Sequence, residues 1–221
     1  MIGSLLLLAA AILIFCNIRQ DKKSGERSRE VLEVLEVRIS DEAKKTDEAK
    51  NLEQPSSEQK YTAPAEDLFA QYGTEDATAA TQEKLAEIDG DSYVGIISIP
   101  RLGVRLPVMS EWSYANLKIS PCRYSGRADT DDIIIAAHNY SSHFGNIADL
   151  LIGDEMIFIA ADGIEYRYTV TQTDTLDGTD VEGLVANDSS SWDLTLFTCT
   201  LSGQSRVCVR AEKADASDDA A

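Results

Sequence analysis

Hydrophobic and polar positions alternate over the C-terminal part of the chain in short runs separated by Gly, Pro and Asp. Such runs are typical of β-strands bounded by turns. They predict strands at residues 93–100, 104–108, 132–138, 155–160, 164–172, 194–199 and 205–211. One or two helical turns are expected at residues 112–119, a short helix at residues 144–151 and a further helical turn at residues 181–186. About seven or eight short strands with only brief helices indicate an all-β barrel or sandwich.

The first 18 residues have a different pattern, because residues 2–18 are almost wholly apolar. A run of about 17 residues is at the short end of what a membrane-spanning helix needs. No Ala-x-Ala cleavage site follows the run, so an uncleaved transmembrane anchor over residues 1–18 is favoured over a signal peptide. A lipoprotein signal ending at Cys16 fits poorly, because bulky Phe15 stands where a small residue is required.

Residues 19–90 are poor in aromatic residues and rich in Glu, Lys, Ala and Gln. The apolar positions of residues 28–39 do not keep a clean helical period. This segment is predicted to be an acidic stalk, part helical and part disordered, that acts as a solvated linker. The globular domain is then expected over residues 91–213, followed by a disordered tail at residues 214–221.

The charge and the cysteine content exclude some classes of function. The formal net charge of -18 argues against nucleic-acid binding, which needs a basic surface. The cysteines are Cys16, Cys122, Cys199 and Cys208. Three of them lie outside the apolar run, so at least one is a free thiol unless it pairs between chains. None has the spacing of a zinc site.

One cysteine lies where a nucleophile could act. Cys199 ends the run of residues 194–199, and Arg206 lies in the next run, so a hairpin makes the two side chains neighbours. His138 ends a buried strand and has the side chain best suited to proton transfer near neutral pH. Each residue also has a structural reading: a half-buried cysteine, a solvated strand arginine and a strand-end histidine.

Thr195-Leu-Phe-Thr-Cys199 resembles the TLxTC motif of sortases, the membrane-anchored cysteine transpeptidases of Gram-positive bacteria. The resemblance extends in order over residues 93–212. Its other segments are Tyr93–Gly103, Leu106-Pro-Val108, Ile135–Tyr140 followed by Phe144-Gly145, Gly153-Asp154 and Arg206–Arg210. It implies a closed sortase-type β-barrel of about eight strands behind an N-terminal membrane helix and stalk.

The resemblance also implies a role for each candidate residue. Cys199 would attack the Thr–Gly carbonyl of an LPxTG-like sorting signal and form a thioacyl-enzyme. His138 would act as general acid and then general base, and Arg206 would stabilise the oxyanion. Thr198 would supply hydrogen-bond donors to the substrate. The partners would be surface proteins bearing sorting signals, and an amine from peptidoglycan or a pilin lysine.

Two residues compete with these assignments. Arg210 shares a strand face with Arg206, but Arg206 lies closer to the turn and so to Cys199. His143 lies in a loop rather than at a strand end, so it is read as a loop residue that borders the groove.

Two further sites stay open at the level of sequence. A disulfide between Cys122 and Cys208 is an alternative in an oxidising location. Asp129, Asp131 and Asp132 could bind calcium, as in some sortases, but a solvated acidic loop is the favoured reading. No cofactor is therefore expected.

Topology and activity also have competing readings. Basic residues follow the apolar run and none precedes it, which by the positive-inside rule alone would keep the domain in the cytoplasm. The resemblance implies a single-pass membrane protein with an extracellular catalytic domain, so a start codon placed too late is the preferred explanation.

The rivals to a transpeptidase are an inactive peptide-binding domain and a cysteine hydrolase. The absence of an Asp-Pro-Trp-like lid motif weighs against the pilus-polymerising subclass, but the subclass is not resolved.

Overall fold

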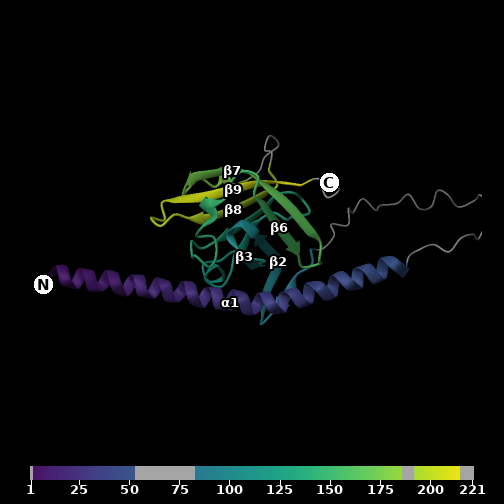
Figure 1. The fold of residues 1–221 in the computed structure, drawn as a ribbon, viewed down its shortest axis with the longest axis horizontal. Coiled ribbons are helices and arrows are strands. Elements are labelled where there is room, and N and C mark those ends of the chain that lie inside the picture. The colour runs from purple at the N-terminus through teal and green to yellow at the C-terminus, as the bar shows by residue number, and fades with distance from the viewer. Residues whose placement is uncertain (1, 53–82, 186–191, 215–221) are drawn as a thin grey trace, which may run out of the picture.

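The computed structural model describes residues 2–52, 83–185 and 192–214, as a β-barrel alongside a long N-terminal helix (Figure 1). The helix, α1, spans Ile2–Leu52. The strands are β1 (Ala86–Ile88), β2 (Asp91–Ile99), β3 (Val104–Met109), β4 (Cys122–Ser125), β5 (Ile133–Ala137), β6 (Glu155–Ala160), β7 (Glu165–Asp177), β8 (Leu194–Cys199) and β9 (Ser205–Lys213). Residues 215–221 of the predicted tail and residues 53–82 of the predicted stalk lie outside the described residues.

Eight of these strands close into a barrel. Their order is β2-β3-β4-β5-β8-β9-β7-β6, and β6 pairs back onto β2. The short β1 is added to β2 outside this ring. The predicted closed barrel of about eight strands is therefore confirmed. The sequence pattern missed β1 and β4, because strands of three and four residues are too short for an alternation to be recognised.

The predicted helical turns are shorter than expected. Each is a single 3-10 turn, at Asn116–Lys118, Ile147–Asp149 and Glu182–Leu184, and a fourth turn lies at Pro100–Leu102. Each is only three residues long and connects strands, but Leu117, Ile147 and Leu184 from three of these turns are buried in the hydrophobic clusters.

The alternation in β8 separates two layers of packing. Leu194 and Leu196 lie in the barrel core with Val209 of β9, whereas Phe197 lies in a second cluster with Cys208. This is the period of two that the sequence predicted for the strand. Because Leu194 and Leu196 are fully buried, β8 is held firmly up to its exposed last residue, Cys199.

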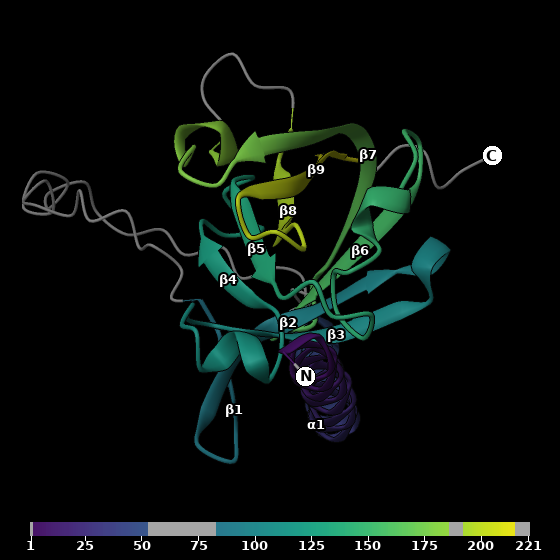
Figure 2. The same ribbon diagram turned by 90° about the vertical axis from the view of Figure 1, so that its left-hand side faces the viewer.

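The helix α1 lies along the outside of the barrel, below β2 and β3 in the end-on view (Figures 1 and 2). One stripe of its surface is buried against the barrel: Ser24, Ser28, Val31, Leu35 and Ile39. These positions are spaced by three or four residues and so share one helical face. Within the predicted stalk of residues 19–90, residues 24–39 are therefore docked on the barrel and residues 86–88 form β1, so these parts are not a solvated linker. The sequence pattern missed this stripe because two of its members are serines.

The predicted membrane-spanning segment over residues 1–18 is not confirmed. Residues 2–18 form the first part of α1, which continues into a charged segment that begins at Arg19. Among the residues that the structure describes, no helix combines the length and the apolar character needed to cross a membrane.

Candidate active site

Parallel pairing of β5 and β8 brings the predicted histidine to the predicted cysteine. Ala137 pairs with Thr198, and His138 and Cys199 are the next residues of the two strands. The Thr198 hydroxyl donates a buried hydrogen bond of 2.9 Å to the Ala137 carbonyl oxygen, which ties the two strand ends together. His138 and Cys199 therefore leave the barrel side by side.

Antiparallel pairing of β8 and β9 places the arginine on the other side of the cysteine. Cys199 and Arg206 are direct partners in the register. The Arg206 guanidinium lies 5.6 Å from the centre of the Phe197 ring, and its Nη1 is buried with no hydrogen-bond partner in the described part of the chain. A buried, unsatisfied donor beside a thiol is available for an oxygen atom of a substrate.

The second candidate arginine is held in the fold by both of its terminal nitrogens, and only its buried Nε has no hydrogen-bond partner among the described residues. Arg210 is 5% exposed, forms an ion pair with Asp174 and donates to the Gly183 carbonyl oxygen at 2.6 Å. Its guanidinium also lies 4.5 Å from the centre of the Trp192 ring. Arg210 therefore joins β9 to its surroundings, and Arg206 is the arginine left for the site.

The cysteines differ in accessibility. Cys199 is exposed, whereas Cys122 and Cys208 are buried, and no disulfide joins any of the four cysteines. Burial raises the pKa of Cys122 to about 12 and that of Cys208 to about 11. Because the thiolate is the reactive form, these two thiols are inert near neutral pH. The alternative Cys122–Cys208 disulfide is not formed.

The environment of His138 favours its neutral form. Burial of the ring lowers the pKa of His138, and the nearby Lys118 cation lowers it further. The ring packs against Tyr140 with a centroid distance of 4.8 Å. Its Nε2 is buried and has no hydrogen-bond partner among the described residues. A neutral imidazole beside Cys199 can accept a proton from an incoming group.

His143 has a structural position that the sequence did not indicate. It is 1% exposed, and its Nε2 lies 3.0 Å from Ser24 Oγ and 3.3 Å from Ser28 Oγ of α1. The sequence predicted that His143 borders a groove. Instead, its ring is buried between α1 and the rest of the loop that follows β5. The signal that could have revealed it is the pair of serines one turn apart on the helix.

The same loop is held to α1 at a second point. Asp21 accepts hydrogen bonds from the backbone N–H and hydroxyl groups of Ser141 and Ser142. Burial raises the pKa of Asp21, but these hydrogen bonds outweigh that effect and lower it. A Cβ atom added at Gly25 would lie 2.9 Å from Ser142 Cβ, so the close approach of helix and loop requires glycine there. Contacts from α1 thus hold the loop that carries His138.

We expect stability to fall below about pH 6.5 because of His143. Burial lowers the pKa of His143 to about 4. The unfolded chain, with an ordinary histidine pKa, therefore binds more protons between the two values. The stabilisation is complete above the unfolded pKa and is lost as pH falls through the folded value, by up to about 3 kcal/mol.

Urea unfolding at pH 7.5 and pH 4.5 measures this effect, with His143→Gln as the comparison. The glutamine amide can still bond to Ser24 and Ser28 but does not titrate. Other groups titrate in both proteins, so the difference reports the titration of His143 together with its coupling to His138 and Asp21. We expect the wild type to lose more stability than the variant on acidification. Equal losses would contradict the assignment.

Two predicted binding roles need revision or stay untested. Because the Thr198 hydroxyl donates its hydrogen to the Ala137 carbonyl oxygen, it is not free to donate to a substrate in this arrangement, and the predicted role of Thr198 stays a prediction. In the acidic loop, Asp129 pairs with Arg127 and Asp131 pairs with Lys213. Within the described ranges, no three acidic, histidine or cysteine side chains are grouped to hold a metal ion.

Comparison with known proteins places this barrel in a family. The family model described as Sortase domain matches residues 97–214, more than half of the 221 residues. The chain is 31% identical over 119 residues to Sortase A of Listeria monocytogenes and 30% identical over 137 residues to Sortase A of Bacillus anthracis. These alignments cover 52% and 56% of this chain, and 52% and 62% of the two relatives.

Solved structures have the same fold. Sortase C1 of Streptococcus agalactiae matches with a TM-score of 0.50 and 26% identity, over 58% of this chain and 70% of that chain. Sortase A of Corynebacterium diphtheriae matches with a TM-score of 0.52 and 22% identity, over 58% of this chain and 64% of that chain. The chain belongs to the sortase family.

Proposed function

We propose that this protein is a cysteine transpeptidase that cleaves an LPxTG-like sorting signal and transfers the cleaved end to an amine. The observation that carries the proposal is the exposed Cys199 thiol, in register with Arg206 and one strand away from His138. Nucleophilic acyl transfer needs these three functions: a thiolate, a proton carrier and an oxyanion donor.

In the first half of the reaction, neutral His138 takes the proton of the Cys199 thiol, and the resulting thiolate attacks the carbonyl carbon after the threonine of the signal. The carbonyl oxygen becomes an oxyanion that accepts a hydrogen bond from Arg206. The C–N bond then breaks, and protonated His138 gives its proton to the departing amine. The products are a thioester on Cys199, a free amine and neutral His138.

In the second half, an amine attacks the thioester carbonyl and neutral His138 accepts its proton. The C–S bond breaks, the Cys199 thiolate is regenerated, and a new amide bond joins the sorted protein to the acceptor. The lowered pKa of His138 suits this step, since the neutral ring is the proton acceptor. Water in place of the amine would give hydrolysis by the same steps.

The proposed setting follows from the family. Sortases are membrane-associated in Gram-positive bacteria, and we place the catalytic domain of this protein outside the membrane, where surface proteins are its substrates. The acceptor would be an amine of peptidoglycan or a pilin lysine. Apolar side chains such as Leu7, Leu13 and Phe15 are exposed on the first part of α1, which supports contact of this part with lipid.

The full chain, kept soluble with a neutral detergent, tests the proposal when mixed with a library of sorting-signal peptides. Intact-mass spectrometry follows the thioacyl adduct, and chromatography follows the released amine. We expect an adduct with at least one peptide and a new amide product when an amine is added. Absence of an adduct with every peptide would refute the proposal. An adduct resolved only by water would identify a hydrolase.

A further inference from the structure

A cavity of about 270 Å³ lies between α1 and the barrel, next to the candidate active site. Three of its lining residues are cations: Lys23 and Arg27 from α1, and Lys118 from the 3-10 turn before β4. The other lining residues are Gln20, Ser24, Ile119 and Tyr140. None of the seven is acidic, although the chain has almost twice as many acidic as basic residues. We call these seven residues the basic pocket.

Contacts between α1 and the barrel form the walls of the basic pocket. Ser24 of α1 donates a hydrogen bond of 2.7 Å to the backbone carbonyl oxygen of Lys118, so the helix and the barrel are joined at its edge. Arg27 is partly neutralised by Asp89 at 3.2 Å and by Glu30 at 3.6 Å. Within the described part of the chain, neither Lys23 nor Lys118 has a carboxylate within ion-pair distance. Two lysines are therefore available to an anion from outside.

The basic pocket adjoins the His138 side of the site. Tyr140 lines the pocket, and its ring packs on His138 with a centroid distance of 4.8 Å. Lys118 is close enough to His138 to influence its protonation. Arg206 lies on the opposite side of Cys199, across the β8–β9 pairing. A molecule whose amine reaches His138 would therefore extend past Tyr140 towards the two lysines.

We propose that the basic pocket binds a carboxylate of the acceptor molecule and so selects an amine with a carboxylate attached nearby. This inference rests on the proposed function and names the chemical class of its second substrate. Ammonium groups bind carboxylates as point charges, and an exposed pair of this kind contributes a modest amount of affinity. A preference of about fivefold for the carboxylate form is expected from that amount.

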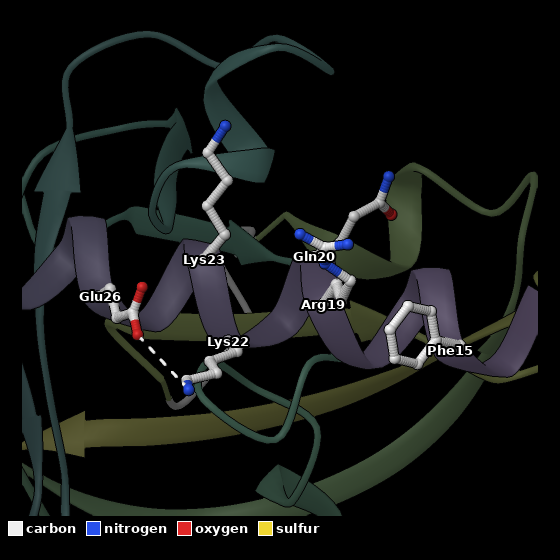
Figure 3. Close-up of a pocket in the computed structure, with 6 residues that line it drawn as sticks. All are labelled: Phe15, Arg19, Gln20, Lys22, Lys23 and Glu26. Carbon is white, nitrogen blue, oxygen red and sulfur yellow. Dashed lines mark ion pairs between the residues drawn. The ribbon is translucent and has the colours of Figure 1, made fainter.

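A second anion could occupy this position, namely the headgroup of an acidic lipid. The chain places other basic residues, Arg19 and Lys22, directly after its apolar segment. The acceptor is favoured because Lys118 belongs to the barrel and not to this basic segment, and because Tyr140 connects the pocket to His138. Figure 3 shows Lys23 projecting from α1 away from Lys22 and its ion-pair partner Glu26, which are 3.9 Å apart. Lys22 therefore provides a matched control.

The experiment uses the full chain in neutral detergent and forms the thioacyl-enzyme with a peptide it accepts. The acceptors are β-alanine, 4-aminobutyrate and 6-aminohexanoate, each compared with its carboxamide. We measure kcat/KM for amide formation in the wild type and in the variants Lys118→Gln, Lys23→Gln and Lys22→Gln. Comparing the acid-to-amide ratio between proteins cancels the difference in basicity of the two amines. It also cancels any effect of Lys118 on His138, because both acceptors use the same histidine.

We expect the wild type to prefer the acid about fivefold at one chain length, and added salt to reduce that preference. Lys118→Gln and Lys23→Gln should each bring the ratio towards one, and Lys22→Gln should leave it unchanged. A thioacyl-enzyme resolved equally by acids and amides would overturn this inference and leave the proposed function intact. No thioacyl-enzyme with any peptide would refute the proposed function instead.

A vesicle-binding experiment distinguishes an acidic lipid headgroup from the acceptor carboxylate as the ligand of the basic pocket. Sedimentation with phosphatidylcholine vesicles, with and without phosphatidylglycerol, measures binding of the same four proteins. If Lys118→Gln and Lys23→Gln lost binding to acidic vesicles while the acid-to-amide ratio of every protein stayed at one, the pocket would be a lipid site and the inference would be wrong. We expect Lys118→Gln to leave vesicle binding unchanged.

Discussion

Replacing Cys199 with alanine is expected to abolish the thioacyl adduct and to lower transfer by roughly 10⁴-fold or more. Cys199 is the thiol at the strand end between His138 and Arg206, and without sulfur no covalent intermediate can form. Because the side chain is exposed, alanine should leave the stability of the barrel nearly unchanged. Intact-mass spectrometry of the variant incubated with an accepted peptide measures the first effect, and urea unfolding measures the second.

The other cysteines are the controls for this prediction. Cys208→Ala removes a buried thiol that packs in the second cluster, so it should cost roughly 1 kcal/mol of stability and leave the adduct intact. In a Cys16→Ala background, iodoacetamide should label Cys199 in the folded protein and leave buried Cys122 and Cys208 unmodified. An adduct that persists in Cys199→Ala would sink the assignment.

The second large effect is expected from Arg206→Lys, which should lower kcat/KM by about 10²–10³-fold. Arg206 has a planar donor group beside Cys199, with a buried guanidinium nitrogen that has no partner among the described residues. Lysine keeps the charge but lacks the planar fork, so it does not reproduce two directed donors. Steady-state assays on the peptide that forms the best adduct measure the loss.

Arg210→Lys is the matched control, since both arginines lie on the same face of β9. It breaks the contacts of Arg210 with Asp174 and with the Gly183 carbonyl, so we expect a loss of about 1–2 kcal/mol in the free energy of unfolding. The kcat/KM of the folded fraction should change only a few-fold. The opposite outcome, with Arg210→Lys inactive and Arg206→Lys active, would exchange the two roles.

The local sequence pattern was sufficient to predict the hairpin that carries Cys199. The period of two in residues 194–199 and 205–211 placed Leu194 and Leu196 inside, and the short connection made Cys199 a neighbour of Arg206. Register follows from such patterns because a slip of one residue would expose the whole core face. Cys199 is exposed because it ends the strand, since Thr195 and Phe197 on the same face are buried.

Such local patterns could not predict the contacts between segments that lie far apart in the sequence. The pairing of β5 with β8 joins Ala137 to Thr198, and only this parallel register sets His138 beside Cys199. In sequence, Arg206 and Arg210 share one face, and only the shorter distance from the turn favoured Arg206. Asp174, Gly183 and Trp192 distinguish them by engaging Arg210.

By itself, the sequence determined seven of the nine described strands, the all-β class, the candidate nucleophile and, through its motifs, the family resemblance. These features depend on the order of neighbouring residues, which an alternating strand expresses directly. Only the tertiary structure decided that α1 docks on the barrel, that His143 lies buried beneath the helix, and that Lys23 and Lys118 share a pocket. The physical reason is that the docked face of α1 mixes serine with apolar residues, so the barrel surface, rather than hydrophobic periodicity, selects it.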